Sequence, residues 1–195
     1  GSKNHDELIN IVLRSLIIGL CFGVLILLLK DVIMPLVDPL LNLSEEVYEP
    51  ASLYISIRAL SAPAALMNFG VTGWLIAIQK TRIVLLLAFV VNGLNAILDV
   101  IFVISFDMGV SGVAAGTLIS EWIACAIGLF IVFSTIKGIN SKTSLSSIFQ
   151  KSSFAVMFSV NLDIFLRTLC LTLSHLWFIN RSSTIGDLQL AINGV

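Results

Sequence analysis

Several ionisable and amide side chains stand inside long apolar stretches of this sequence, where they could bind an ion or a proton. The clearest set lies between residues 92 and 121. Each residue turns a helix by about 100°, so Asn92, Asn95 and Asp99 share one side of a helix, and Thr117 and Glu121 share one side of the next. An Asp at the centre of a membrane helix costs about 2.5–3.5 kcal/mol to insert. Such residues are therefore candidates for a functional site.

The two polar stripes meet if their stretches form an antiparallel hairpin. The intervening turn centres near Met108, with Asp99 nine residues before it and Thr117 nine residues after it. The same count places Asn95 level with Glu121. Carboxylate, amide and hydroxyl oxygens suit a hard cation such as Na⁺, and a buried carboxyl group can instead carry a proton. A third interpretation is a hydrogen-bonded network that only holds the helices together.

Other ionisable residues favour structural interpretations. Asp163 and Arg167 are four residues apart, which predicts an ion pair on one helical face. Arg14 can extend toward the membrane surface, and Arg58 can do the same or pair with an acid. The sequence has no phosphate-binding glycine loop, nucleophile elbow or HExxH motif. We therefore expect a permeating ion or substrate rather than an enzyme, no cofactor, and no metal site beyond a possible Na⁺.

Composition shows which elements must position these residues. Of the 195 residues, 57% are hydrophobic and 12% are charged, whereas a soluble domain carries about a quarter charged residues. The net charge of −1 offers no basic surface to nucleic acid. Five stretches reach the roughly 20 apolar residues that cross a membrane: 8–29, 54–78, 83–104, 110–133 and 154–178. The predicted fold is an all-α, polytopic bundle of transmembrane helices.

Loop charges predict the orientation of these spans. Segment 31–53 carries five acidic residues and no Lys or Arg, whereas the basic residues gather on the other side at Lys3, Lys80, Arg82, Lys137, Lys142 and Lys151. The basic side is expected to be cytoplasmic, which places the start of the chain in the cytoplasm and the protein in a bacterial-type inner (plasma) membrane. Prolines in segment 31–53 predict a short interfacial helix between them, and Pro63 predicts a kink in the second span.

The connections predict how the spans are grouped. Segment 134–153 is rich in Ser and Lys and predicts a cytoplasmic linker between a first bundle, within residues 1–133, and a second that starts at 154–195. Very short connections near Lys80 and Asp107 predict that spans two, three and four are antiparallel neighbours. Two GxxxG pairs, Gly19 with Gly23 and Gly112 with Gly116, predict close helix contacts. A start without Met and an apolar last segment lead us to expect an internal stretch of a longer protein.

Several runs resemble one family of transporters. Those runs are 54–58 (YISIR), 61–68 (SAPAALMN), 92–103 (NGLNAILDVIFV), 108–117 (MGVSGVAAGT) and 161–170 (NLDIFLRTLC). They are similar, in order and spacing, to helices four to seven of multidrug and toxic compound extrusion (MATE) transporters, and most similar to the DNA-damage-inducible-protein-F-type branch. The family has twelve helices in two six-helix lobes. The resemblance implies that this chain holds helices three to six, the inter-lobe linker and the start of the second lobe.

The resemblance also implies a function and a site. It implies an H⁺- or Na⁺-coupled antiporter that exports amphipathic organic compounds by alternating access, works among membrane lipids and is a monomer when full length. Its cation site would use Asn95, Asp99 and Thr117. Asn68, Asn92 and Glu121 are possible additions, of which the resemblance does not assign Glu121 to the site. The family also uses an Asp on its first helix, which this chain lacks. Two alternatives stay open: a lipid-linked-precursor flippase of the same superfamily, and a non-transporting membrane scaffold.

Overall fold

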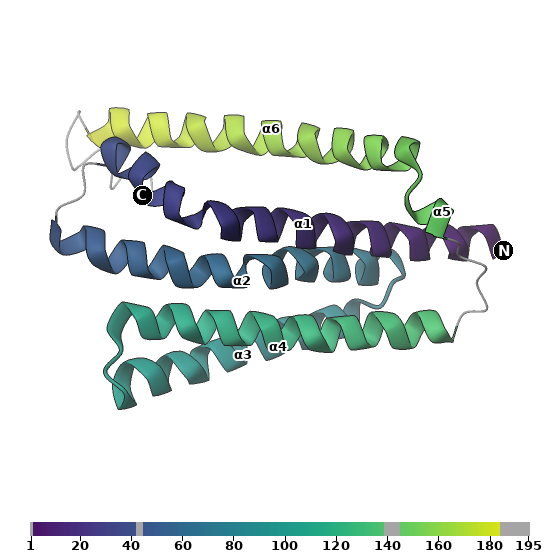
Figure 1. Ribbon diagram of the computed structural model, residues 1–195, viewed down its shortest axis with the longest axis horizontal. Helices are drawn as coiled ribbons and strands as arrows, with labels where there is room; N and C mark the ends of the chain where they lie inside the picture. Colours follow the sequence, from purple (N-terminus) through teal and green to yellow (C-terminus); the bar gives the residue numbers. More distant parts are fainter. Residues whose placement is uncertain (1, 42–44, 139–144, 184–195) are drawn as a thin grey trace. The chain divides into compact units, whose positions relative to one another are not determined.

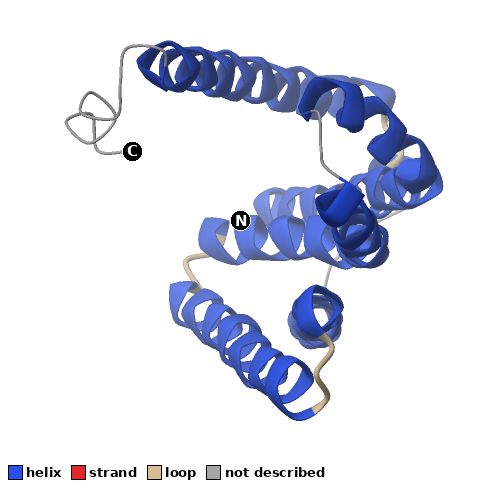
Figure 2. Ribbon diagram, turned by 90° about the vertical axis from the view of Figure 1, so that its left-hand side faces the viewer, coloured by secondary structure: helices blue, strands red, loops and turns tan. Residues whose placement is uncertain are grey.

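Helices make up the architecture. The computed structural model describes residues 2–41, 45–138 and 145–183, and no strand occurs among them (Figure 2). The elements are α1 (Ser2–Leu41), α2 (Glu45–Ala77), α3 (Thr81–Val100), the π-helical turn η1 (Ile101–Ser105), α4 (Gly109–Lys137), α5 (Leu145–Ile148) and α6 (Lys151–Ser183). The predicted all-α fold is confirmed.

Four helices of the described part are long and apolar enough to cross a membrane. Their candidate spans are Asp6–Val32, Glu46–Ala77, Thr81–Ser105 and Gly109–Lys137. They match the first four predicted spans in order, and the second ends one residue earlier than predicted. The fifth predicted span, 154–178, lies within α6, and some of its side chains are outside the described residues.

The connection between the first two spans differs from the prediction. α1 continues to Leu41 and α2 already begins at Glu45, so the described residues contain no separate interfacial helix between the prolines. Pro35 is part of α1, and Pro50 and Pro63 are part of α2. Each proline removes only one amide donor from its helix. Both helices nevertheless continue through these positions.

The chain divides into two compact units, residues 1–148 and 149–195. This division falls inside the predicted linker 134–153, and the assignment of the units to two lobes stays a prediction. In the first unit α2 packs along α1 and along α4, and α4 packs along α3 (Figure 1). α2 and α3 touch each other much less. α4 therefore lies between α2 and α3. Of the predicted neighbours, α3 and α4 pack together as a hairpin, whereas α2 and α3 are joined by a short turn but make little contact.

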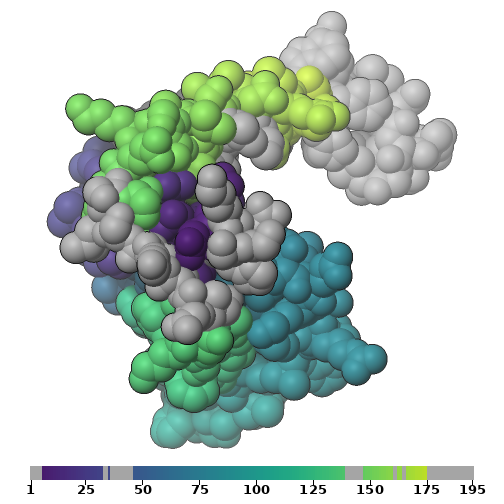
Figure 3. All heavy atoms as spheres, turned by 90° about the vertical axis from the view of Figure 1, so that its right-hand side faces the viewer, coloured from purple at the N-terminus to yellow at the C-terminus, as the bar shows by residue number. Residues whose placement is uncertain are grey.

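The core of this unit lies where α1, α2 and α4 meet. Buried members of this core come from all three helices and include Val12, Leu16, Val71, Leu75, Cys125 and Val132. At one end of the core, the α2–α3 turn is tied to the last part of α4, because Lys80 Nζ donates a hydrogen bond to Thr135 Oγ1 (3.3 Å). The space-filling view from this end shows the two segments side by side (Figure 3). Tight turns close the hairpins, with left-handed backbone at Gln79 (φ 60°) and Asp107 (φ 53°).

Small residues let these helices approach each other, as the GxxxG pairs predicted. A Cβ atom on Gly19 would lie 3.0 Å from the Leu66 backbone, and one on Gly23 would collide with Pro63. On α4, a Cβ atom on Gly112 would lie 3.0 Å from Phe102 Cβ. These are backbone-level contacts between helices, the arrangement typical of such pairs in membranes.

Candidate functional site

Asn95, Asp99 and Thr117 form one cluster between α3 and α4. Asn95 Nδ2 donates a hydrogen bond to Thr117 Oγ1 (3.0 Å) and lies 3.3 Å from Asp99 Oδ1, to which it also donates. The Thr117 hydroxyl in turn donates to the carbonyl oxygen of Val113 (3.0 Å). All three side chains are partly buried. The structure therefore brings together the three residues on which the predicted cation site depends.

Gly116 makes the space that the Asp99 carboxylate occupies. A Cβ atom added to Gly116 would collide with Asp99 Oδ1 and lie 3.3 Å from the Asp99 amide nitrogen. A side chain of any size at this position of α4 would displace the carboxylate. The sequence marked Gly116 only as a packing position, and its contact with Asp99 depends on the rotation of α4 against α3.

The helix that carries Asp99 changes its geometry directly after that residue. α3 ends at Val100 and continues as a π-helical turn, in which the amide of Phe106 donates to the carbonyl of Ile101 (3.2 Å). Short π-helical turns inside α-helices are frequent at functional sites. No pattern of residues predicted this turn.

No cationic side chain in the described part of the chain pairs with Asp99. Among the described residues, ion pairs form only between Lys30 and Asp31 and between Arg58 and Glu121. The Asp99 carboxylate accepts its hydrogen bond from a neutral amide instead. A carboxylate in this position can hold a cation or take up a proton.

Glu121 and Asn68 belong to a second network, which joins α4 to α2. Arg58 Nη2 donates to Glu121 Oε1 (3.2 Å), while Arg58 Nη1 donates to the Ser61 hydroxyl (2.9 Å). Asn68 Nδ2 donates to the backbone oxygen of Glu121 (3.1 Å). Glu121 therefore does not face Asn95, although the two residues are equally far from the turn. Its other oxygen, Oε2, is buried without a partner among the described residues.

Asn92 lies outside both networks. Its side chain is exposed on α3 and donates to the carbonyl of Ala88 (2.7 Å) in its own helix. Nothing in the described part of the chain connects it to the cluster around Asp99.

The predicted Asp163–Arg167 ion pair is not formed in the described structure. Both side chains are exposed on α6, and neither takes part in an ion pair of the described residues. Exposed pairs at this spacing gain little free energy, so helical spacing alone does not hold the two side chains together.

Arg14 differs most from its prediction. It is buried rather than extended to the membrane surface: Nε donates to the carbonyl of Ile148 (2.7 Å) and Nη2 donates to that of Ser147. One turn earlier on α1, Asn10 Oδ1 accepts a hydrogen bond from Ser147 Oγ (3.4 Å). Asn10 and Arg14 thus fix α5 against α1. The only sequence signal was this polar pair at a spacing of four residues.

Comparison with known proteins places the chain in a family. The MatE family model matches residues 1–101. Over 195 residues, all of this chain, it is 34% identical to "DNA damage-inducible protein F" of Escherichia coli (strain K12), covering 42% of that protein. It is 30% identical over 167 residues to "Protein DETOXIFICATION 42" of Arabidopsis thaliana, which is 82% of this chain and 31% of that protein.

A third relative is the "Multidrug export protein MepA" of Staphylococcus aureus (strain MRSA252). The identity is 28% over 198 aligned positions, which is 100% of this chain and 43% of that protein. The chain thus spans less than half the length of the curated relatives it matches here. No solved structure matches it.

Proposed function

The chain belongs to the MatE family, and on this basis we propose that it works in a membrane exporter that couples inward movement of H⁺ or Na⁺ to outward movement of amphipathic organic compounds. The predicted family is confirmed, and so is the prediction of a membrane protein with several transmembrane helices. The export of organic compounds is suggested by the printed name of the staphylococcal relative, a multidrug export protein. An inner-membrane location with a cytoplasmic start of the chain, and a monomeric state, are part of the proposal.

The observation that carries this proposal is the Asp99 carboxylate, which lies between two helices and has no cationic partner among the residues that the structure describes. In the arrangement described, the Asn95 amide donates to both Asp99 and Thr117, so its N–H groups occupy the space between the two oxygens. Rotating that amide by half a turn would turn its oxygen toward the same space. Asp99, Asn95 and Thr117 would then offer three oxygens to one Na⁺.

A proton can use the same cluster in a different way. A protonated Asp99 becomes a donor as well as an acceptor, so it can donate to the Asn95 amide oxygen once that amide turns its oxygen toward the carboxyl group. Either ion therefore reorganises the contact between α3 and α4. If the two conformations of an exporter differ in this contact, ion binding shifts the population between them, as alternating access requires.

The test is Asp99→Asn in the natural protein, expressed from its complete gene and reconstituted in vesicles. This change keeps the shape and most hydrogen bonds of the side chain but removes its charge. We expect normal insertion, loss of ion-driven efflux of a fluorescent organic cation such as ethidium, and loss of the response to pH or Na⁺. Asp163→Asn is the matched control, because Asp163 is exposed on α6 and lies outside the cluster.

The opposite result has a definite meaning. If Asp99→Asn exports as well as the parent protein at every pH and Na⁺ concentration, the cluster only holds α3 and α4 together. The protein would then be a transporter whose coupling does not involve Asp99, whereas a parent protein without any efflux would favour the scaffold.

A further inference from the structure

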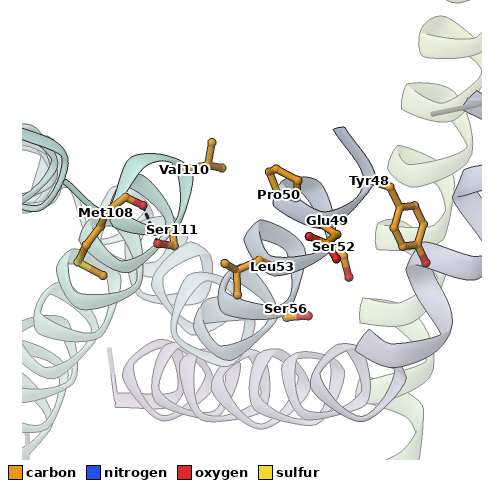
Figure 4. A pocket seen from close by; sticks show the side chains of 9 residues that line it. All are labelled: Tyr48, Glu49, Pro50, Ser52, Leu53, Ser56, Met108, Val110 and Ser111. Carbon is orange, nitrogen blue, oxygen red and sulfur yellow. Dashed lines mark hydrogen bonds between the residues drawn. The ribbon is translucent and has the colours of Figure 1, made fainter. Parts of the chain in front are cut away.

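A pocket lies at the end of the first unit where α2 begins and α3 turns into α4. It has a volume of about 650 Å³ and opens between these two segments (Figure 4). Its α2 wall includes Tyr48, Glu49, Ser52 and Ser56, and its opposite wall includes Met108 and Ser111. The pocket is therefore separate from the cluster around Asp99, which lies deeper between α3 and α4.

Three polar side chains of α2 line this pocket without partners. Glu49, Ser52 and Ser56 follow one another at spacings of three and four residues, which places them on one face of the helix. Within the described residues, none of the three takes part in a hydrogen bond or an ion pair. Helical Ser hydroxyls commonly bond a carbonyl of the preceding turn, as Ser111 does with Met108 (2.7 Å). Ser52 and Ser56 are free to bind something else.

The remaining wall of the pocket is apolar and aromatic. Leu53, Met108 and Val110 contribute hydrocarbon and thioether surface, and Tyr48 contributes an aromatic ring. Aromatic rings attract organic cations through their faces, and Met adapts to ligands of irregular shape. One carboxylate, several hydroxyl groups and an apolar wall together match a molecule with one positive charge and an apolar body.

The charge of the surrounding chain favours the same class of ligand. Segment 31–53 contains five acidic residues and no Lys or Arg. A field of one sign around a pocket raises the local concentration of ions of the other sign. The same negative charge would weaken the binding of an anionic ligand.

We propose that this pocket is a binding site for amphipathic organic ammonium ions, with Glu49 as the charge partner and Ser52 and Ser56 as hydrogen-bonding groups. The site rests on the proposed function, because the exported compounds supply its ligand. By the orientation predicted from the loop charges it lies on the outer side, where an exported cation leaves the protein. It would be a second binding site, distinct from any site that binds the compound before transport.

The experiment uses thiol protection in the whole protein with its natural cysteines replaced. Leu53→Cys places a thiol on the pocket wall, and Val47→Cys places one on an exposed part of α2 outside it. Ethidium at saturating concentration should slow the reaction of a maleimide with Leu53→Cys at least about threefold, since a bound ligand covers the thiol. It should leave the rate at Val47→Cys unchanged.

Substitution of Glu49 tests whether its carboxylate binds the positive charge of the ligand. Glu49→Gln should raise the ethidium concentration needed for half-maximal protection by about tenfold, the usual effect of losing one interaction with a charged group. Glu46→Gln is the matched control, because Glu46 is an exposed acid of the same helix that does not line the pocket. Ser52→Ala with Ser56→Ala should raise that concentration to a smaller extent.

The outcomes separate this site from the proposed function. Protection that persists when Asp99→Asn has abolished efflux, and that depends on Glu49, supports the site. Protection that depends on Glu49 in a protein showing no efflux at all supports the site and contradicts the proposed function. Equal labelling of Leu53→Cys with and without ethidium, or protection indifferent to Glu49→Gln, overturns the site even when efflux depends on Asp99.

Discussion

Arg58 Nη2 lies 3.2 Å from Glu121 Oε1, and this ion pair joins α2 to α4 one helical turn from Thr117. Thr117 itself faces α3 and accepts a hydrogen bond from Asn95. α4 therefore carries two polar contacts on neighbouring faces of the same two turns, one toward α3 and one toward α2. A rotation of α4 about its axis would change the cation cluster and the ion pair together.

The first prediction concerns this ion pair. Glu121→Gln or Arg58→Gln alone leaves one partly buried charge without its partner, so each should lower the free energy of unfolding by about 1–2 kcal/mol. This is less than the 3–5 kcal/mol of a fully buried pair, because the side chains of Arg58 and Glu121 are 29% and 15% exposed. The double variant should recover part of the loss. Thermal unfolding followed by tryptophan fluorescence provides the measurement.

Asp31→Asn serves as the control for this prediction. Asp31 pairs with Lys30 at 2.9 Å, but its side chain is 76% exposed, so its loss should leave the midpoint of unfolding nearly unchanged. Efflux should depend less on Glu121 than on Asp99. A double variant as unstable as the sum of the two single variants would show that Arg58 and Glu121 act independently.

The second prediction concerns Gly116. Gly116→Ala would place a methyl group where Asp99 Oδ1 now lies, so the carboxylate has to leave the cluster. We expect the ion response to be lost as in Asp99→Asn, measured as the Na⁺ or H⁺ dependence of efflux. Gly93→Ala is the control: it changes glycine to alanine on α3 with nothing within 4 Å of the new methyl group, and should leave the ion response intact. An ion response retained in Gly116→Ala would contradict the described packing of α4 on α3.

The cation cluster could be predicted from the sequence because a short turn fixes the register of its two helices. Counting outward from Met108 placed Asp99 and Thr117 at equal depth. The turn between α3 and α4 is too short to let one helix shift along the other. The same count failed for Glu121, since depth does not determine direction: 117 and 121 differ by about 40° around the helix axis, and a guanidinium on α2 attracts the carboxylate.

Contacts between distant segments could not be predicted in this way. The Arg14 guanidinium and the Ile148 carbonyl are separated by 134 positions in the chain, and no local pattern in the sequence pairs them. The helix ends were also misjudged at segment 31–53, where prolines suggested breaks although the flanking apolar residues continue both helices. Runs of apolar residues were enough to predict the membrane spans. The partners of buried charges could not be predicted in the same way, because they depend on how the helices pack.

The third prediction concerns Arg14. Arg14→Lys keeps the charge but lacks the planar fork of donors that reaches the carbonyls of Ser147 and Ile148. We expect α5 to detach from α1 more often, so that a cysteine at Ile148, now 8% exposed, reacts faster with a thiol reagent in the Arg14→Lys variant. Arg82→Lys is the control, because Arg82 is exposed. Equal reaction rates in the two variants would mean that α5 is held by its other contacts.

The last prediction separates an oxygen ligand from a packing contact at Thr117. Thr117→Ser keeps the hydroxyl group that accepts from Asn95, whereas Thr117→Val keeps the shape and removes the oxygen. If Thr117 supplies a cation ligand, Na⁺ should stabilise the parent and Thr117→Ser alike, by about 2.7 kcal/mol at a concentration 100 times the dissociation constant. Thr117→Val should need much more Na⁺ for the same rise in unfolding temperature, with choline as the ionic-strength control. A proton-coupled protein would show no Na⁺ effect in any of the three, and the pH dependence of efflux should then shift in Thr117→Val only. Identical Na⁺ and pH responses of Thr117→Val and the parent would show that the hydroxyl only packs between α3 and α4, and would remove Thr117 from the proposed site.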